Sequence, residues 1–155
     1  MLRNLLRITL LLSLLAMACE IDHGLGTIDS GISGRVIFLH PERKPARVDA
    51  VRVVAVVNFP PQSLGDLVFT NTSINLSQPS PSFRVPAPLA HYVLVGAIYR
   101  EKGKEWDYAK ILGFYGSNPD SNIYDIKPVT LSKAHPLAAN IDIYCDWAQV
   151  PGSSR

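Results

Sequence analysis

Apolar and polar residues alternate with a period of two over most of the chain, and proline and glycine interrupt the alternation at short intervals. We therefore expect short strands from residue 32 onward, joined by turns. The clearest expected strands span 32–38, 48–59, 82–88, 90–100, 106–116, 126–132 and 138–147. Residues 67–69 form either a further short strand or a helical turn, and 74–76 form another short element.

The segment 48–59 differs from the others because both of its faces are apolar. One face is expected to carry Val51, Val53, Ala55, Val57 and Phe59. Val54 and Val56 make the opposite face apolar as well, which is typical of a strand buried on both sides. We therefore expect a central strand, ended by Pro60 and Pro61 because proline cannot donate to a ladder.

Segment 90–100 is the strongest strand of the sequence, and the charged turn 101–105 is expected to close a hairpin into 106–116. Its two faces are expected to carry Val93, Val95, Ala97 and Tyr99 against Tyr92, Leu94, Gly96 and Ile98. In the last strand the inward residues are expected to be Ile141, Ile143, Cys145 and Trp147, with Asp142, Tyr144 and Asp146 outward.

About seven to eight short strands at this spacing predict an all-β fold, a single antiparallel Greek-key β-sandwich of the immunoglobulin-like or prealbumin-like type. The sandwich is expected to span 32–149, after an N-terminal signal helix. Glycines and a lack of apolar pattern indicate a flexible tether over 19–31, and 150–155 is a frayed tail. We find no internal repeat in the sequence and expect no second domain.

The order of GRVIF, FRVPAPLAHYVLVGA and KPVTLSKAHPLAANIDIYCD resembles the carboxypeptidase-regulatory-like, or transthyretin-like, β-sandwich modules of exported bacterial proteins. Those modules open with a G-x-V-x-F strand and close with a V-T-V…I-D-I strand. The chain departs from them at Leu89 and Ala90, where such modules often carry a Pro-Gly turn. The resemblance covers 32–147 and implies a seven-stranded Greek-key sandwich without catalytic residues.

Residues 1–18 read as a signal peptide, with two arginines, a short apolar run and small residues at the end. The run is too short to cross a bilayer. The sequence Leu-Ala-Met-Ala-Cys at 15–19 resembles a bacterial lipobox, which implies cleavage between Ala18 and Cys19 and acylation of Cys19. The Ala-x-Ala pattern at 16–18 equally suits ordinary cleavage, which would give a secreted protein.

Acylation of Cys19 would attach the protein permanently to a membrane. Glu20 is not the aspartate that retains lipoproteins of this class in the inner membrane, so the outer membrane is favoured. With Cys19 acylated, Cys145 has no partner and is expected to be a buried thiol. Without acylation, a disulfide between Cys19 and Cys145 becomes possible.

Charge excludes one class of partner. The chain has 15 Lys and Arg against 13 Asp and Glu, and removing Arg3 and Arg7 with the leader leaves 13 of each. No basic stripe remains for nucleic acid.

Catalytic and metal-binding patterns are missing as well. His23, His40, His91 and His135 stand at no zinc-ligand spacing, and the sequence has no G-x-S-x-G. Asp142 and Asp146 are expected to face solvent, so we expect no enzyme, metal or cofactor. The loop from Asn118 to Asp125 has oxygen ligands that suit calcium, but a plain turn is the simpler interpretation.

Large aromatic residues concentrate in the expected hairpin. If Trp106, Tyr108 and Tyr115 share an exposed face, they would form a stacking platform for a sugar or a protein. The sequence therefore predicts a non-enzymatic, lipid-anchored protein of the cell envelope with a structural or protein-interaction module and an unidentified envelope partner. The alternative is a carbohydrate or small-ligand binding module built on the hairpin around Trp106.

Overall fold

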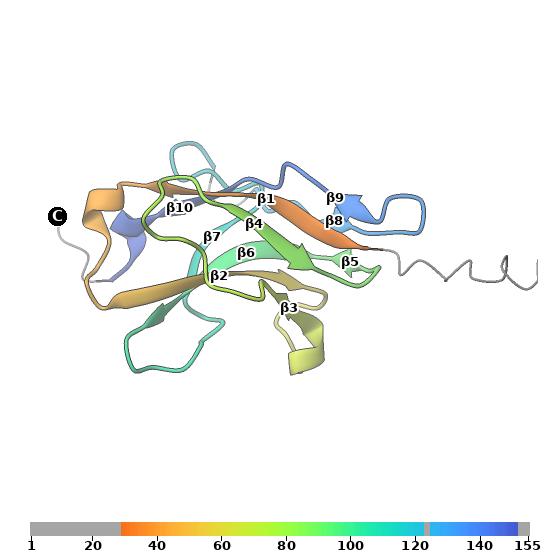
Figure 1. Ribbon diagram of the computed structural model, residues 1–155, viewed down its shortest axis with the longest axis horizontal. Coiled ribbons are helices and arrows are strands. Elements are labelled where there is room, and N and C mark those ends of the chain that lie inside the picture. Colours follow the sequence, from red (N-terminus) through yellow and green to blue (C-terminus); the bar gives the residue numbers. More distant parts are fainter. Residues whose placement is uncertain (1–28, 123–124, 152–155) are drawn as a thin grey trace, which may run out of the picture.

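A computed structural model describes residues 29–122 and 125–151. The expected signal peptide, Cys19 and most of the expected tether lie outside the described residues, as does the end of the tail. The described chain is all β without an α-helix (Figure 1), as expected. Its strands are β1 (Gly31–Leu39), β2 (Val48–Val56), β3 (Leu67–Phe69), β4 (Ser82–Pro86), β5 (His91–Tyr92), β6 (Leu94–Glu101), β7 (Ile111–Phe114), β8 (Val129–Thr130), β9 (Leu137–Ala138) and β10 (Ile143–Asp146).

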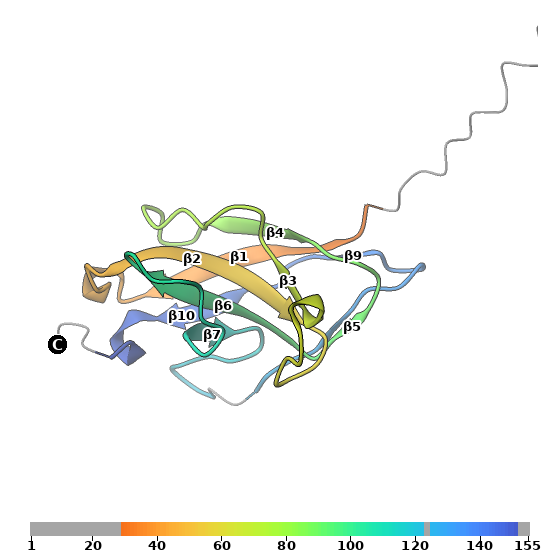
Figure 2. The same cartoon turned by 90° about the horizontal axis from the view of Figure 1, so that it is seen from below.

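Two four-stranded sheets face each other across the core and form the upper and lower layers of Figure 1, and Figure 2 looks onto the sheet that contains β2 and β6. One has the order β3-β2-β6-β7, and the other has the order β10-β1-β4 with β9 also paired to β1. Strands β5 and β8 form a separate pair. The expectation of a purely antiparallel fold is wrong at strand β1, which pairs in parallel with both β10 and β9. The chain crosses between the sheets before these strands form, so no hairpin reverses their direction.

Strand β2 is central, as its two apolar faces predicted, since it pairs with β3 on one side and β6 on the other. It ends at Val56, three residues earlier than expected. Val57 is half-buried and Phe59 is 59% exposed, so Phe59 does not continue the inward face. The chain bends at Asn58 before the prolines are reached.

The expected strand 90–100 is interrupted by a bend at Val93. The residues before the bend therefore point to different sides than the alternation predicted. Tyr92 lies in the core with Val95, whereas Val93 is 37% exposed, so the expected alternation is wrong at this end. The Val93 N–H donates to the Val56 carbonyl, while Tyr92 pairs with Val129 in the small β5-β8 sheet. The bend therefore allows the residues before it to pair with β8 and the residues after it to pair with β2 and β7.

The expected hairpin exists, because β6 pairs antiparallel with β7. Its connection is longer than expected, however, and runs from Lys102 to Lys110 instead of closing at residue 105. Asp107 forms a turn there by accepting the Ala109 N–H on its side chain and the Lys110 N–H on its carbonyl. This turn uses N–H groups that a ladder would need, so 106–110 is not a strand.

Some expected short elements also differ from the structure. Residues 74–76 form no strand, although Ile74 is buried and donates its N–H to Val51. Strand β9 was not expected. Within 126–132 only Val129 and Thr130 form a strand.

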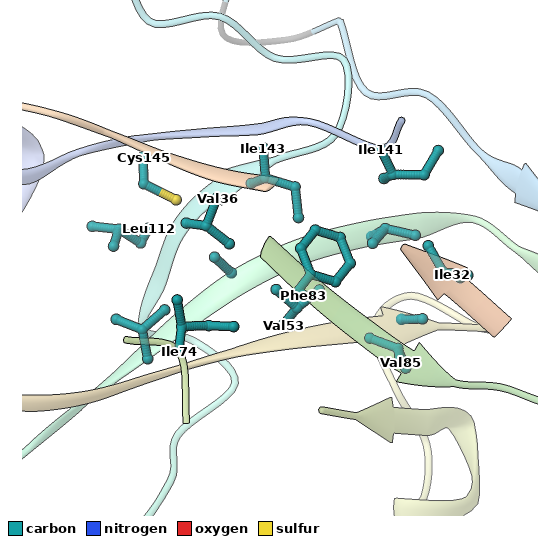
Figure 3. Packing of buried hydrophobic residues seen from close by; sticks show 14 of the residues in the cluster. Ile32, Val36, Val53, Ile74, Phe83, Val85, Leu112, Ile141, Ile143 and Cys145 are labelled. Carbon is teal, nitrogen blue, oxygen red and sulfur yellow. The ribbon is translucent and has the colours of Figure 1, made fainter. Parts of the chain in front are cut away.

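The main core fills the space between the sheets (Figure 3). The inward residues of the last strand are buried as predicted, and their outward neighbours are half-buried. Cys145 is a free and fully buried thiol, and its burial raises its pKa well above the usual range. Among the described residues, no helix is both long and apolar enough to span a bilayer.

Candidate functional site

The outer face of the sheet β3-β2-β6-β7 is apolar. Val54, Val56, Leu94 and Ile98 form a second buried cluster there, separate from the main core. Partly buried side chains pack against it, and these are Leu67, Phe69, Trp106, Ile111 and Phe114. The other sheet presents polar groups to solvent, including the ion pair between Arg35 and Asp142. The two outer faces of the sandwich therefore differ in chemistry.

Two loops partly cover the apolar cluster and leave a crevice between them. The loop 102–110 contributes Tyr108, and the segment after β2 contributes Phe59 and Pro61. The crevice has a cavity volume of about 20 Å³. Room of that size holds about one water molecule and no larger ligand.

A wider, open hollow adjoins this crevice and shares Phe59, Leu94 and Phe114 with it. Val93 and Ile126 line the hollow. Phe59, Val93, Tyr108 and Ile126, here called the outer-face patch, are four of the six large apolar side chains that are exposed in the described residues. Most of the exposed large apolar side chains of the described residues are therefore gathered around this crevice and hollow.

Positive charge lies at one end of this face. The guanidinium carbons of Arg52 and Arg100 lie 5.2 and 5.3 Å from the ring centroid of Trp106, which is cation–π distance. Arg100 also pairs with Asp49, and hydrogen bonding to Arg100 lowers the pKa of that carboxyl. Arg52 has no carboxylate within ion-pair distance among the described residues, and its buried Nε has no hydrogen-bond partner.

The three aromatic residues singled out in the sequence do not form one platform. Trp106 packs on the outer-face cluster beneath the two guanidinium groups, while Tyr108 at the crevice is 56% exposed. Tyr115 packs instead against the main core, where its backbone bridges to Ile143. Sequence reasoning missed Phe59, Val93 and Ile126 as exposed residues. The signal that could have revealed the face was the apolar outward pair Val54 and Val56.

Asp66 holds the loop that carries Phe59. Its carboxylate accepts hydrogen bonds from Asn58 Nδ2 at 2.9 Å and from the backbone N–H groups of Gln62 and Ser63 at 2.8 and 3.0 Å. These bonds, with the one from Asn58 the largest cause, lower the pKa of Asp66. The loop is thus fixed by one ionised group.

We expect acid to loosen this loop. Because the pKa of Asp66 is lower in the folded than in the unfolded protein, its stabilisation is complete above the unfolded value of about 3.9 and disappears as the pH falls through the folded value. Urea unfolding of wild type and Asp66→Asn should therefore differ most near neutral pH and converge below about pH 4. A difference independent of pH would contradict this assignment.

The other candidate groups do not converge. No three His, Cys, Asp or Glu side chains of the described residues lie close enough together to hold a metal ion. In the loop considered for calcium, Asn118 Oδ1 accepts the Asp120 N–H in a local turn, and Asp125 lies 3.8 Å from Lys127. His91 bonds to Thr130 across the β5-β8 pair.

No protein-family model, characterised protein or solved structure matches this chain. Its function is therefore inferred from the residues and geometry described above.

Proposed function

We propose that the protein is a non-enzymatic lipoprotein of the cell envelope, anchored through acyl chains on Cys19, whose β-sandwich binds a partner protein. Anchoring is supported by the signal peptide and by the lipobox resemblance around Ala18 and Cys19. Glu20 favours the outer membrane. The binding surface is the outer-face patch together with Arg52.

The observation that carries the interaction role is the contrast between the two outer faces. A sheet with one face on the core usually presents polar residues to water on the other. The outer face of the sheet β3-β2-β6-β7 is instead apolar, and the segments beside its strands expose Phe59, Val93, Tyr108 and Ile126 next to the buried cluster. Contiguous exposed apolar groups of this kind mark interaction sites.

Arg52 defines the chemistry of the partner. Its guanidinium is fixed over Trp106 but has no carboxylate partner among the described residues. A partner that places apolar side chains on the patch and a carboxylate at Arg52 would satisfy both features, because arginine binds carboxylates with two parallel hydrogen bonds.

The alternative role, in carbohydrate or small-ligand binding, has less support. A drug-sized ligand needs an enclosing pocket of about 300 Å³ or more. The apolar crevice measures about 20 Å³, and the adjoining hollow of about 680 Å³ is open to solvent. Two guanidinium groups already lie over the Trp106 ring that a sugar would stack on.

We also propose the prealbumin-like Greek key as the finer fold class. The first strand lies between β4 and β10, and β2 lies in the opposite sheet. An immunoglobulin constant domain would place the first two strands in one sheet.

The anchor is tested by the intact mass and detergent-phase partitioning of the mature protein, compared with Cys19→Ala. We expect an acylated Cys19 in wild type and complete loss of partitioning in the variant. An unmodified, water-soluble wild type would contradict the anchor and would bring the Cys19 to Cys145 disulfide back into consideration.

The binding face is tested by photo-crosslinking in the native cells. A photoreactive amino acid in place of Tyr108 or Phe59 should give a specific protein adduct, and the matched position Ser82, exposed on β4 of the other sheet, should not. Arg52→Glu should abolish the adduct by repelling the partner carboxylate. Equal adducts at Ser82, or none at Tyr108 and Phe59, would contradict this face.

A further inference from the structure

The two exposed leucines outside the outer-face patch lie where the described chain begins. Leu89 is 36% exposed and Leu137 is 57% exposed. The Gly31 N–H donates to the Pro136 carbonyl, and Gly31 is the register partner of Leu137. On the other side, the Ala87 N–H donates to Ser30. Figure 2 shows that β1 starts at the end of the domain where β9 and β5 also lie.

Lys133 at this end has no ion-pair partner among the described residues. The segments 84–92 and 131–138 contain no Asp or Glu, and Lys133 is exposed in the turn between Ser132 and His135. The nearby carboxylate of Asp29 is paired with Arg84 at 2.5 Å. Leu89, Lys133 and Leu137, here called the tether end, thus combine apolar side chains with an uncompensated cation.

We propose that the tether end rests on an anionic bilayer, with Leu89 and Leu137 inserted at the level of the headgroups and Lys133 against lipid phosphates. Apolar side chains beside a basic group are typical of protein surfaces at a membrane interface, where they enter about 5–10 Å. Lys133 adds attraction to anionic lipids.

This inference rests on the proposed acylation of Cys19, because attachment at Cys19 determines which end of the domain lies near the membrane. Cys19 and Asp29 are separated by ten residue steps, which span at most about 35 Å. The tether end is therefore the part of the domain closest along the chain to the anchor, and the opposite end near Lys104 is farther from it.

The test uses the full acylated protein in vesicles of phosphatidylethanolamine and phosphatidylglycerol, with a fluorophore on a single introduced cysteine. Ala134→Cys labels the exposed turn of the tether end, and Lys104→Cys is the matched control at the opposite end. Cys145 is buried and stays unlabelled in the folded protein. We expect spin-labelled lipid to quench the fluorophore at Ala134→Cys and not at Lys104→Cys.

A second pair of samples separates insertion from mere proximity. Adding Leu89→Ser and Leu137→Ser to the Ala134→Cys protein should abolish quenching, while circular dichroism checks that the fold is kept. Equal quenching at both labels, or quenching unchanged by the serines, would overturn the bilayer contact and leave the anchor standing if the mass shows acylated Cys19. An unmodified Cys19 would overturn both proposals.

Discussion

Replacing Trp147 with alanine is expected to lower the free energy of unfolding by about 3–5 kcal/mol. The side chain is 1% exposed, and its ring stacks on Phe38 with centroids 5.3 Å apart and planes 20° from parallel. Truncation removes this contact and leaves a cavity at the end of β10. The total free energy of unfolding of a domain is about 5–15 kcal/mol. A loss of this size would therefore leave the domain only marginally stable.

Urea unfolding of the mature protein, followed by far-UV circular dichroism, measures this loss. Tyr108→Ala is the matched control, because it also removes an aromatic ring but from a side chain that is 56% exposed. The control should change stability by about 0.5 kcal/mol or less, as surface substitutions do. If Trp147→Ala were as stable as the control, the burial of Trp147 would not contribute to the free energy of unfolding as proposed.

Adding a single methyl group at Gly113 is expected to cost about 1–3 kcal/mol. A Cβ there would overlap the Tyr144 carbonyl oxygen and lie 3.2 Å from the Cys145 sulfur. Gly113 is on β7 and the other two residues are on β10, so the absence of a side chain lets the edges of the two sheets approach. Alanine at this position would push β7 and β10 apart.

Gly65→Ala is the control for Gly113→Ala. A Cβ at Gly65 meets only the Ser63 hydroxyl at 3.4 Å, and the backbone there is not left-handed. The same unfolding measurement should give a near-neutral change at Gly65 and a clear loss at Gly113. Similar losses at both positions would mean that general backbone effects, and not the contact between β7 and β10, explain the result.

The all-β fold and the central place of β2 were predictable because they depend on local patterns. Alternation identified β1, β4 and β10, and two apolar faces identified β2. The bend at Val93 was not predictable in this way. It depends on a hydrogen bond to Val56 and on the pairing of Tyr92 with Val129, both far away in sequence. Parallel pairing of β1 with β10 is non-local for the same reason.

The candidate site was predictable only in part. Local composition pointed to the hairpin, and the structure places Trp106 and Tyr108 on the same outer face. It could not show that Trp106 lies under Arg52 and Arg100, because these contacts join separate strands. The exposure of Phe59 follows from the early end of β2, which alternation alone does not specify.

The parallel pairing of β1 with β10 also governs the order in which the domain can fold. The first strand lies between β4 and the last strand, and the ion pair from Arg35 to Asp142 beside this seam joins residues 107 positions apart. During N-to-C synthesis, β1 emerges long before β10 exists to cover its edge. The domain must therefore wait for its final residues, and contacts of such sequence separation predict slow folding. A chain that reaches its compact form late stays unfolded during synthesis, and an unfolded chain is the form that the export proposed above would require.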